Sequence, residues 1–179
     1  MPKTKRDWLV SGMQILVGQG VMGLTIENLC RSLDVTKGSF YHHFKNQPDY
    51  QAQLLAFWQE EDTRQVVAAA GKIEGNSRKI DSLIEILGNR SAETANPELA
   101  IRAWALQNEN VRGYVEQVDK QRIELTTEML KEVTGDKERA HFLARMMYAM
   151  LVGSYSIIPP IKGNEVIDLY QEFTRLYAK

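Results

Sequence analysis

The feature that most constrains the fold of this 179-residue chain is the recurrence of apolar side chains at intervals of three and four residues. Residues 80–87, 111–133 and 166–177 all follow this spacing, which is typical of amphipathic helices. No segment makes a convincing strand, and the polar, glycine-containing segment 72–79 is expected to be a loop. The pattern predicts an all-α protein of about nine helices.

Caps and helix-breaking residues indicate where these helices begin and end. Thr25, Thr36 and Asn46 are each suited to start a helix, because their side-chain oxygens accept hydrogen bonds from the free backbone N–H groups. Gly135 and the pair Pro159–Pro160 are expected to end helices. The caps at Thr25 and Thr36 predict two short helices close together near the N-terminus.

The run MQILVGQGVMG, residues 13–23, ends in Gly18, Gly20 and Gly23 and so matches the GxGxxG pattern of dinucleotide-binding enzymes. That function requires a strand before the glycines, an acidic residue about twenty positions later and further parallel strands. No Asp or Glu lies between Asp34 and Asp49, and the preceding run fits a helix about as well as a strand. We interpret the glycines as a turn between two helices, with an oxidoreductase as the alternative.

Charge is distributed unevenly along the chain. The net charge is −1 overall, which excludes binding of nucleic acid through general basicity, but residues 1–47 carry +3 and the remainder −4. The single cysteine, Cys30, excludes an internal disulfide and is expected to be a buried, inert thiol in a cytoplasmic protein. The longest apolar stretch, MMYAMLVGSY, is too short to span a bilayer, so no membrane association is expected.

Three consecutive N-terminal segments resemble the DNA-binding domain of TetR-type transcriptional regulators. They are an apolar segment ending at Gly20, TIENLCRSL (residues 25–33) and TKGSFYHHF (residues 36–44), and the match to the family pattern runs through them without a gap. The resemblance implies a three-helix helix-turn-helix DNA-binding domain in residues 1–47. It also implies a helical ligand-sensing and dimerisation domain in residues 48–179.

In a helix-turn-helix domain, the third helix presents its first residues to base edges while neighbouring groups hold phosphates. By resemblance, the residues expected to contact DNA are Thr25, Thr36, Lys37, Gly38, Ser39, Tyr41, His42, His43 and Lys45. Phe40 and Phe44 are expected to be core residues. The basic segment KTKR, residues 3–6, is either a solubilising tail or an arm that touches phosphates.

Three positions depart from the pattern of the family. Asp34 stands where a turn glycine is usual, although Asp tolerates left-handed geometry. Gly12 replaces a helix alanine, which is expected to loosen the first helix by up to about 1 kcal/mol. Gln47 replaces a residue that is often lysine, so one phosphate contact is expected to be missing.

The resemblance further implies a homodimer formed by the last two helices, about residues 137–158 and 165–178. The residues expected at that interface are Ala140, Leu143, Ala144, Met147, Ala149, Met150, Leu151, Gly153, Phe173 and Tyr177. The expected effector is an unknown small molecule. Candidates to line its pocket, chosen by residue type and position, are Trp104, Asn108, Tyr114 and Met147, for which an ordinary core role is the alternative.

No catalytic, cofactor or metal site is predicted. His42 and His43 are adjacent and point in different directions on a helix, and the chain's third histidine is His141. The acidic residues are spread over helix faces that are expected to be solvated. The function expected is therefore that of a DNA-binding regulator, most simply a dimeric repressor released from a palindromic operator by its effector. A helical protein that senses a ligand or binds a partner without recognising DNA is the other alternative.

Overall fold

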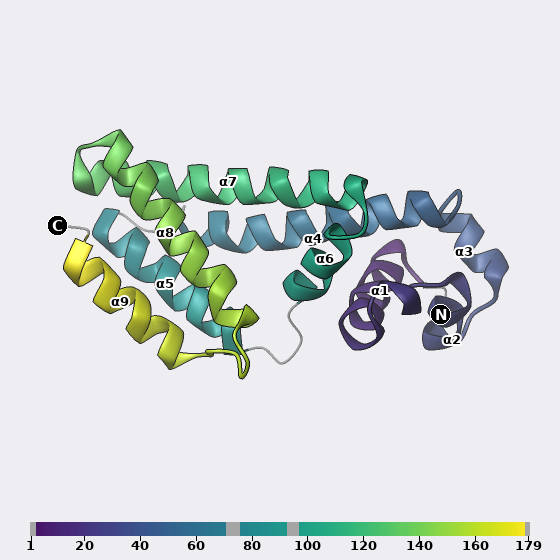
Figure 1. Cartoon of the computed structure of the whole chain (residues 1–179). Helices are drawn as coiled ribbons and strands as arrows, with labels where there is room; N and C mark the ends of the chain where they lie inside the picture. Colours follow the sequence, from purple (N-terminus) through teal and green to yellow (C-terminus); the bar gives the residue numbers. More distant parts are fainter. Residues whose placement is uncertain (1–2, 71–75, 93–96, 178–179) are drawn as a thin grey trace. The chain divides into compact units, whose positions relative to one another are not determined.

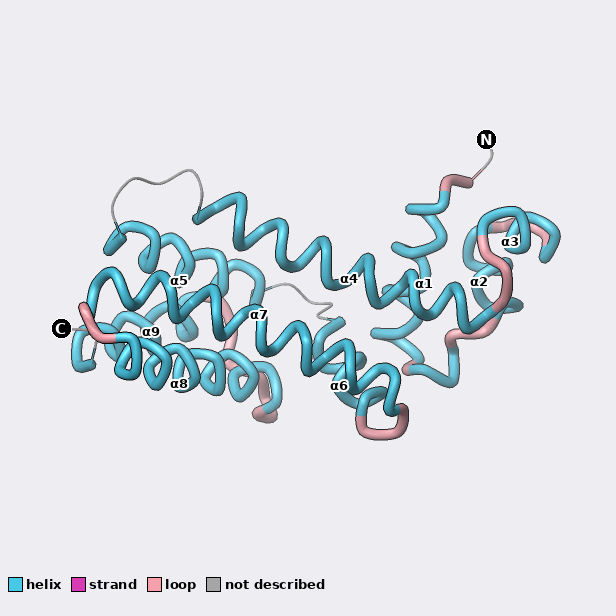
Figure 2. Tube along the Cα trace, turned by 90° about the horizontal axis from the view of Figure 1, so that it is seen from above, coloured by secondary structure: helices cyan, strands magenta, loops and turns pink. Residues whose placement is uncertain are grey.

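The computed structural model describes residues 3–70, 76–92 and 97–177, with side chains over 3–61, 80–89 and 97–177. The described residues form nine α-helices and one 3-10 turn, and no strand is found among them (Figures 1 and 2). In chain order the elements are α1 (Lys5–Gln19), η1 (Val21–Gly23), α2 (Ile26–Leu33), α3 (Lys37–His43), α4 (Gln47–Ala70), α5 (Asn76–Ala92), α6 (Pro97–Ala105), α7 (Glu109–Thr134), α8 (Lys137–Ser156) and α9 (Asn164–Tyr177). The prediction of an all-α fold is confirmed.

Most of the predicted helix ends are confirmed. The Thr25 hydroxyl accepts a hydrogen bond from the Asn28 N–H at 3.2 Å, and the Asn46 side chain accepts one from the Asp49 N–H at 2.9 Å. Gly135, with φ 68°, follows the last residue of α7. The predicted loop at 72–79 is wrong over residues 76–79, which already belong to α5, and residues 71–75 lie outside the described part.

The glycines of the GxGxxG pattern lie after a helix. The apolar run before them is α1, and Gly20 ends it with φ 67° while its N–H donates to the Leu16 carbonyl at 3.0 Å. Gly18 lies in the last turn of α1 with open space around its Cα, and Gly23 ends η1. The interpretation as a helix-to-helix turn is confirmed, because the strand that dinucleotide binding requires is a helix here.

The chain divides into two compact units. The N-terminal unit comprises the described residues of Met1–Glu61 and Ala95–Val115, and the C-terminal unit comprises those of Asp62–Thr94 and Glu116–Lys179. These units are defined by packing. The division into a DNA-binding domain at 1–47 and a regulatory domain at 48–179 concerns function and stays a prediction.

Aromatic side chains form the centre of the N-terminal unit. Trp8 and Phe40 are fully buried and meet edge to face, with ring centroids 5.5 Å apart, and Phe44 meets Tyr50 in the same way at 4.9 Å. The Tyr50 hydroxyl donates to the Trp8 carbonyl at 2.9 Å. Burial raises the pKa of Tyr50, so the hydroxyl stays protonated and remains a donor. The core positions predicted for Phe40 and Phe44 are confirmed.

Gly12 is required by this core. A Cβ built at Gly12 would lie 1.8 Å from the Tyr50 hydroxyl oxygen and 3.0 Å from its ring carbon Cζ. The sequence predicts only the helix-loosening effect of this glycine. Its packing role comes from Tyr50, a residue 38 positions later in the sequence.

The C-terminal unit has a core formed by α5, α7, α8 and α9. Its buried residues are Ile80, Leu83, Ile84, Leu87, Met129, Leu130, Ala140, Leu143, Ala144, Met147, Val166, Tyr170 and Phe173. Helices α5 and α9 pack closely, because a Cβ on Gly88 would lie 2.3 Å from Ile167 Cγ1. The Tyr170 hydroxyl also donates to the Met147 carbonyl at 2.8 Å, which ties α9 to α8.

This core corrects part of the predicted dimer surface. Ala140, Leu143, Ala144, Met147 and Phe173 face the interior of their own chain, so their assignment to a partner contact is wrong. Of the predicted interface residues, Ala149 and Tyr177 are exposed. Large apolar side chains that were not predicted there are also exposed on the two helices: Phe142 on α8, 62% exposed, and Leu169 and Leu176 on α9.

Candidate nucleic-acid interface

The short helix α3 is held from one side by its own aromatic residues and exposes the other. Phe40 and Phe44 are buried at 0% and 2% exposure, whereas the intervening Tyr41 is 57% exposed and His42 is also exposed. Asp34 supplies the turn before α3 with a left-handed backbone at φ 54°, which only a few side chains tolerate. A helix anchored in this way presents a polar surface of fixed orientation to solvent.

Lys37, the first residue of α3, forms an ion pair with Glu27 of α2, and both side chains are more than half exposed. Hydrogen bonding to Glu27 raises the pKa of Lys37, and the same bond lowers the pKa of the Glu27 carboxyl. Exposed ion pairs contribute little to stability because water and salt screen them. Lys37 can therefore exchange Glu27 for a phosphate at small cost.

Thr36, Gly38 and Ser39 form the first turn of α3 and its cap. Thr36 begins the helix as predicted, but its exposed hydroxyl makes no capping hydrogen bond. A Cβ on Gly38 would meet only the Thr36 hydroxyl, at the ordinary contact distance of 3.7 Å. Neither packing nor backbone conformation within the chain requires this glycine, so the free space above it is available to a ligand. Ser39 is half-buried, and its N–H donates to the Thr36 carbonyl at 3.0 Å.

The residues expected to hold the DNA backbone differ in how much of their side chain is free. The Thr25 hydroxyl is used to cap α2, whereas Lys45 is exposed and its backbone N–H donates to Asp49 at 2.9 Å. The side-chain amide of Gln47 donates to the Leu24 carbonyl at 2.9 Å. Gln47 therefore ties the start of α4 to the segment before α2, a structural role that accounts for its departure from the family pattern.

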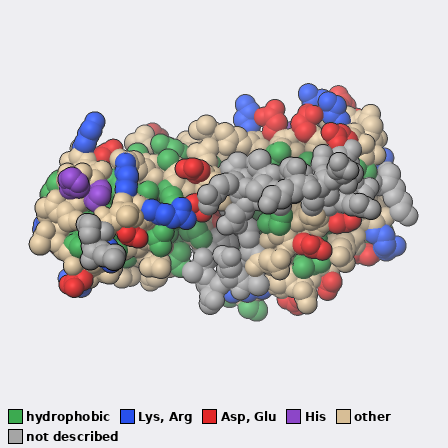
Figure 3. All heavy atoms as spheres, turned by 180° about the vertical axis from the view of Figure 1, so that it is seen from behind, with side chains coloured by type: hydrophobic (Ala, Val, Ile, Leu, Met, Phe, Trp, Pro, Cys, Tyr) green, Lys and Arg blue, Asp and Glu red, His purple; other side chains and the backbone are tan. Residues whose placement is uncertain are grey.

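The two histidines of α3, which the sequence analysis grouped together, have different surroundings. His42 is exposed, whereas His43 is half-buried and its Nε2 lies 3.0 Å from the carbonyl oxygen of Lys3. Their ring centroids are 5.1 Å apart. Figure 3 shows histidine side chains beside Lys and Arg side chains on a face of the N-terminal unit.

The N-terminal arm, residues 3–6, is an ordered part of this surface. Thr4 and Asp7 form a capping box: the Thr4 N–H donates to the Asp7 carboxylate at 2.7 Å, and the Asp7 N–H donates to the Thr4 hydroxyl at 3.3 Å. Lys5 lies over the Phe44 ring at 5.6 Å, and Arg6 pairs with Glu61 at 2.9 Å. This capping box was not predicted, although the Thr-x-x-acid spacing that precedes an apolar run is its usual signal.

The four predicted effector residues are not among the lining residues of the two cavities described below. Trp104 is buried, Tyr114 is half-buried, and Asn108 accepts a hydrogen bond from the Val111 N–H at 3.1 Å and so caps α7. Met147 belongs to the core of the C-terminal unit. Core and capping roles account for three of the four residues.

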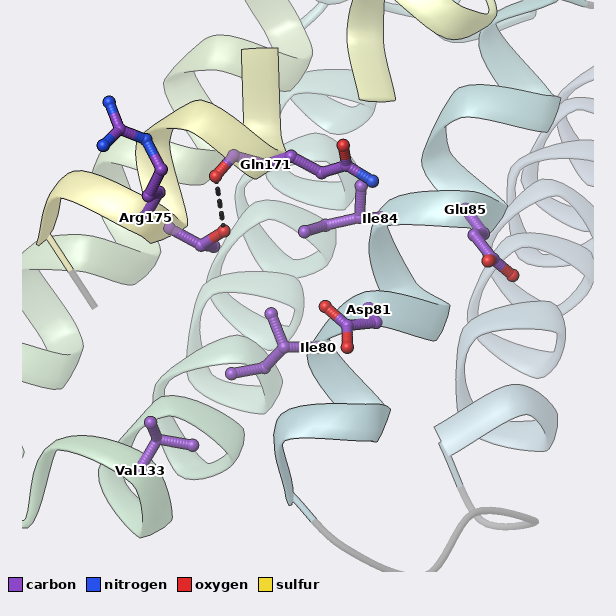
Figure 4. A pocket seen from close by; sticks show the side chains of 8 residues that line it. Ile80, Asp81, Ile84, Glu85, Val133, Gln171 and Arg175 are labelled. Carbon is purple, nitrogen blue, oxygen red and sulfur yellow. Dashed lines mark hydrogen bonds between the residues drawn. The ribbon is translucent and has the colours of Figure 1, made fainter. Parts of the chain in front are cut away.

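Two cavities in the C-terminal unit have the size of a small-molecule site. The larger, about 580 Å³, is lined by residues of α5, α7 and α9: Ile80, Asp81, Ile84, Glu85, Val133, Gln171, Thr174 and Arg175. Ile80 and Ile84 point towards α9, and the Gln171 side chain extends towards Ile84 (Figure 4). The second, about 470 Å³, lies along α7 and α8 and includes Thr127 and His141. Small-molecule sites commonly have volumes of about 300–1,000 Å³.

Within 3–70, 76–92 and 97–177, no three or more His, Cys, Asp or Glu side chains gather in an arrangement able to hold a metal ion. Among the helices of this described part, none is both long enough and apolar enough to cross a membrane.

Comparison with known proteins agrees with this geometry. Among solved structures, the TetR-family regulator SCO4454 from Streptomyces coelicolor superposes with a TM-score of 0.83 at 15% identity, over 100% of this chain and 92% of that one. Reduced NemR from E. coli gives 0.79 at 16% identity, over 96% and 95% of the two chains. AibR, solved with isovaleryl coenzyme A and operator DNA, gives 0.74 at 13% identity, over 97% and 98%.

These likenesses concern the fold. No curated protein sequence matches the chain. The family model described as bacterial regulatory proteins, tetR family, matches residues 9–47, the segment that contains η1, α2, α3 and most of α1. The helix-turn-helix segment of this chain therefore matches the DNA-binding segment of the tetR family of bacterial regulatory proteins, and the whole chain shares the fold of TetR-family regulators.

Proposed function

We propose that the protein is a dimeric repressor that binds a near-palindromic operator and is released from it by a small molecule. The observation that carries this proposal is the anchoring of α3. Phe40 and Phe44 fix the helix from below, while Lys37, Tyr41 and His42 stay exposed above it. An exposed polar helix with a fixed orientation is what base readout in the major groove requires.

The sequence-derived set of DNA contacts stays a proposal with distinct roles. We assign base readout to Lys37, Gly38, Ser39, Tyr41 and His42, and backbone contact to Thr36 and Lys45. His43, the remaining member of the set, lies against the Lys3 carbonyl and is treated separately below. Thr25 is suited to a backbone contact through the peptide groups at the start of α2, because its hydroxyl is already used as a cap. Contacts to phosphate would fix the register on the duplex, and contacts to bases would supply specificity.

Dimer formation is proposed through the outward faces of α8 and α9. Phe142, Ala149 and Gly153 follow one another at helical spacing on α8, and Leu169 and Leu176 are exposed on α9. A two-fold pairing of these faces would cover apolar area that a lone chain leaves in water. It would also present two copies of α3 to half-sites about 34–36 Å apart, or a multiple of that distance.

Effector release requires a ligand that binds the conformation unsuited to DNA more tightly than the conformation suited to it. The cavity lined by Ile80, Ile84 and Gln171 is one place of suitable size within the C-terminal unit. Trp104, Asn108, Tyr114 and Met147 remain the proposal made from residue type. AibR, solved with an acyl coenzyme A and operator DNA, is a structural neighbour that binds both kinds of partner. A cytoplasmic location follows from a function exerted on chromosomal DNA.

The test is selection of bound sequences from random DNA by the purified full chain, followed by footprinting of the selected site. We expect two protected half-sites related by two-fold symmetry and a steep fall of affinity with salt. The variant Phe142→Glu should dissociate the dimer and weaken operator binding, whereas Leu106→Glu, an exposed apolar residue after α6, should not. Binding that is indifferent to sequence, or a wild-type chain that binds as a monomer, would contradict the proposal.

A further inference from the structure

His43 and the N-terminal arm are joined by a contact that the DNA-binding role of α3 does not require. His43 is the last residue of α3 and is half-buried, and its Nε2 lies 3.0 Å from the Lys3 carbonyl oxygen, 40 residues away in the sequence. A histidine ring engaged with the main chain of its own protein is poorly placed to read a base edge. The bond instead fixes the position of Lys3, which precedes α1.

The other contacts of the arm show which of its cations remains available. The Arg6 guanidinium pairs with Glu61, and the Lys5 ammonium lies over the Phe44 ring. The Lys3 ammonium makes no hydrogen bond or ion pair with any described residue. Hydrogen bonds from Thr4 hold the pKa of the neighbouring Asp7 below its usual value, and the charge of Lys3 makes a smaller contribution.

We propose that His43 is a positioning residue: its hydrogen bond to the Lys3 carbonyl holds the arm beside α3 so that the Lys3 ammonium contacts a DNA phosphate. This inference rests on the proposed function, because it needs a DNA duplex bound at α3. It assigns the arm to the interface and removes His43 from the residues that contact DNA directly.

The capping box of Thr4 and Asp7 orders the backbone next to Lys3, which the proposed phosphate contact requires. Thr4, between Lys3 and α1, is held by two hydrogen bonds to the Asp7 carboxylate, from its N–H at 2.7 Å and its hydroxyl at 2.8 Å. With Thr4 fixed on one side and its own carbonyl fixed by His43, Lys3 has an ordered backbone. An ordered lysine loses less conformational entropy when it binds a phosphate than one on a free tail.

The experiment measures operator affinity against salt at pH 8 for the full chain and for Lys3→Ala, His43→Ala, His43→Gln and the double variant Lys3→Ala/His43→Ala. The operator is the one recovered by selection. Each lost phosphate contact lowers the slope of log affinity against log salt by about 0.9, and Lys3→Ala removes one contact from each half-site, so the slope for the dimer should fall by about 1.8. Between 50 and 200 mM salt, the wild type should then lose about 12-fold more affinity than Lys3→Ala.

His43→Ala should lower the slope by the same amount although no charge is removed from the arm, and the double variant should match either single one. His43→Gln, which keeps a side-chain N–H donor, should retain most of the slope. Lys162→Ala, an exposed lysine before α9, controls for the loss of one positive charge and should leave the slope unchanged. Thermal unfolding of each variant separates these effects from loss of the fold.

A second measurement reports position directly. The variant Lys3→Cys can be labelled with an iron chelate that cleaves nearby DNA, because the chain's other thiol, Cys30, is buried and burial raises its pKa. Cleavage should be confined to one short backbone segment in each half-site, and adding His43→Ala should spread or abolish it.

With specific operator binding intact, an unchanged slope for Lys3→Ala would overturn the inference. The inference would also be overturned if Lys3→Ala and His43→Ala changed the salt slope additively, or if His43→Ala left the cleavage pattern unchanged. Failure of the wild type to select any operator would instead contradict the proposed function itself.

Discussion

The α3 surface of the N-terminal unit and the core of the C-terminal unit are encoded over very different sequence distances. In the N-terminal unit, nine consecutive residues, 36–44, supply the exposed surface of α3 and two of the aromatic residues that anchor it, Phe40 and Phe44. In the C-terminal unit, the core joins residues from Ile80 to Phe173, and Gly88 packs closely against Ile167. A function carried by a short segment can be recognised from sequence, whereas one built from distant helices cannot.

The largest change in stability is expected at the neighbouring aromatic residues Phe40 and Tyr41 of α3. They test whether one short segment contains residues that only stabilise the fold beside residues that only bind DNA. Phe40→Ala removes a fully buried ring and should lower the free energy of unfolding by about 3–5 kcal/mol. Tyr41→Ala, at a position 57% exposed, should change stability by less than about 0.5 kcal/mol yet abolish most specific DNA binding. Thermal unfolding and operator titration of both variants check this, and equal destabilisation would break the separation.

Gly12 is the N-terminal example of a tight packing contact. Gly12→Ala should destabilise the chain by about 1–3 kcal/mol, because the new methyl group overlaps the Tyr50 hydroxyl. In a Tyr50→Phe background the same change should cost less, since the nearest atom is then gone. Gly18→Ala, in open space on the same helix, is the matched control and should be neutral or stabilising. Equal costs in both backgrounds would contradict the assignment of the clash.

Gly88 is the C-terminal counterpart, and a comparable cost there would show that both units are packed to the same tolerance. Gly88→Ala should cost about 1–3 kcal/mol, because its Cβ would lie 2.3 and 2.7 Å from Ile167 Cγ1 and Cδ1. Combining it with Ile167→Ala should recover part of that cost relative to the sum of the single changes. Gly113→Ala, on α7 with no neighbour within 4 Å, is the control. The cycle is measured by denaturant unfolding, and strict additivity would argue against the contact.

A substitution at Gly38 tests DNA binding at a position where an added methyl group disturbs no packing within the chain. Gly38→Ala should leave the chain as stable as the wild type or slightly more stable, since its Cβ meets only Thr36 at 3.7 Å. If DNA approaches the backbone here, operator affinity should fall about ten-fold, the order of one lost base contact. Circular dichroism and operator titration together check the prediction, and unchanged affinity would remove Gly38 from the interface.

The smallest expected effect concerns the pairing of Lys37 with Glu27. Glu27→Gln should raise operator affinity a few-fold at pH 7, because it frees Lys37 and removes a negative charge from the interface. The pKa of Glu27 is lowered in the folded chain, so the pair is present above the ordinary carboxyl pKa and is lost as pH falls through the lowered value. The difference between variant and wild type should therefore vanish only in acid, and weaker binding by the variant at pH 7 would contradict the competition.

Helix positions and ends followed from the sequence because caps and spacing act locally. Thr25, Asn46 and Gly135 sit where predicted, since capping depends on hydrogen bonds within three or four residues. The direction in which a helix faces was less accessible. Met147 and Ala144 on α8 face their own core, because an apolar stripe is equally suited to cover another helix of the chain or a second copy.

In the candidate site, too, local features could be predicted from the sequence and long-range contacts could not. The identity of α3 and its exposed residues followed from the motif, but the hydrogen bond from His43 to the Lys3 carbonyl did not, because no local pattern links residues 40 positions apart. The role of Gln47 was likewise hidden, since its partner is the Leu24 carbonyl. Side-chain type alone does not reveal whether a polar group is free or already bonded.

By itself, the sequence determined an all-α fold, the helix-turn-helix in its first 47 residues and a glycine turn in place of a dinucleotide site. Helical period, caps and glycine conformations are short-range properties, and they are written directly in the order of residues. Only the tertiary structure decided that Gly12 accommodates Tyr50, that α8 turns its alanines inward, and that His43 holds the N-terminal arm. Each of these depends on contacts between segments far apart in the chain, where packing selects one of several arrangements that the local pattern allows.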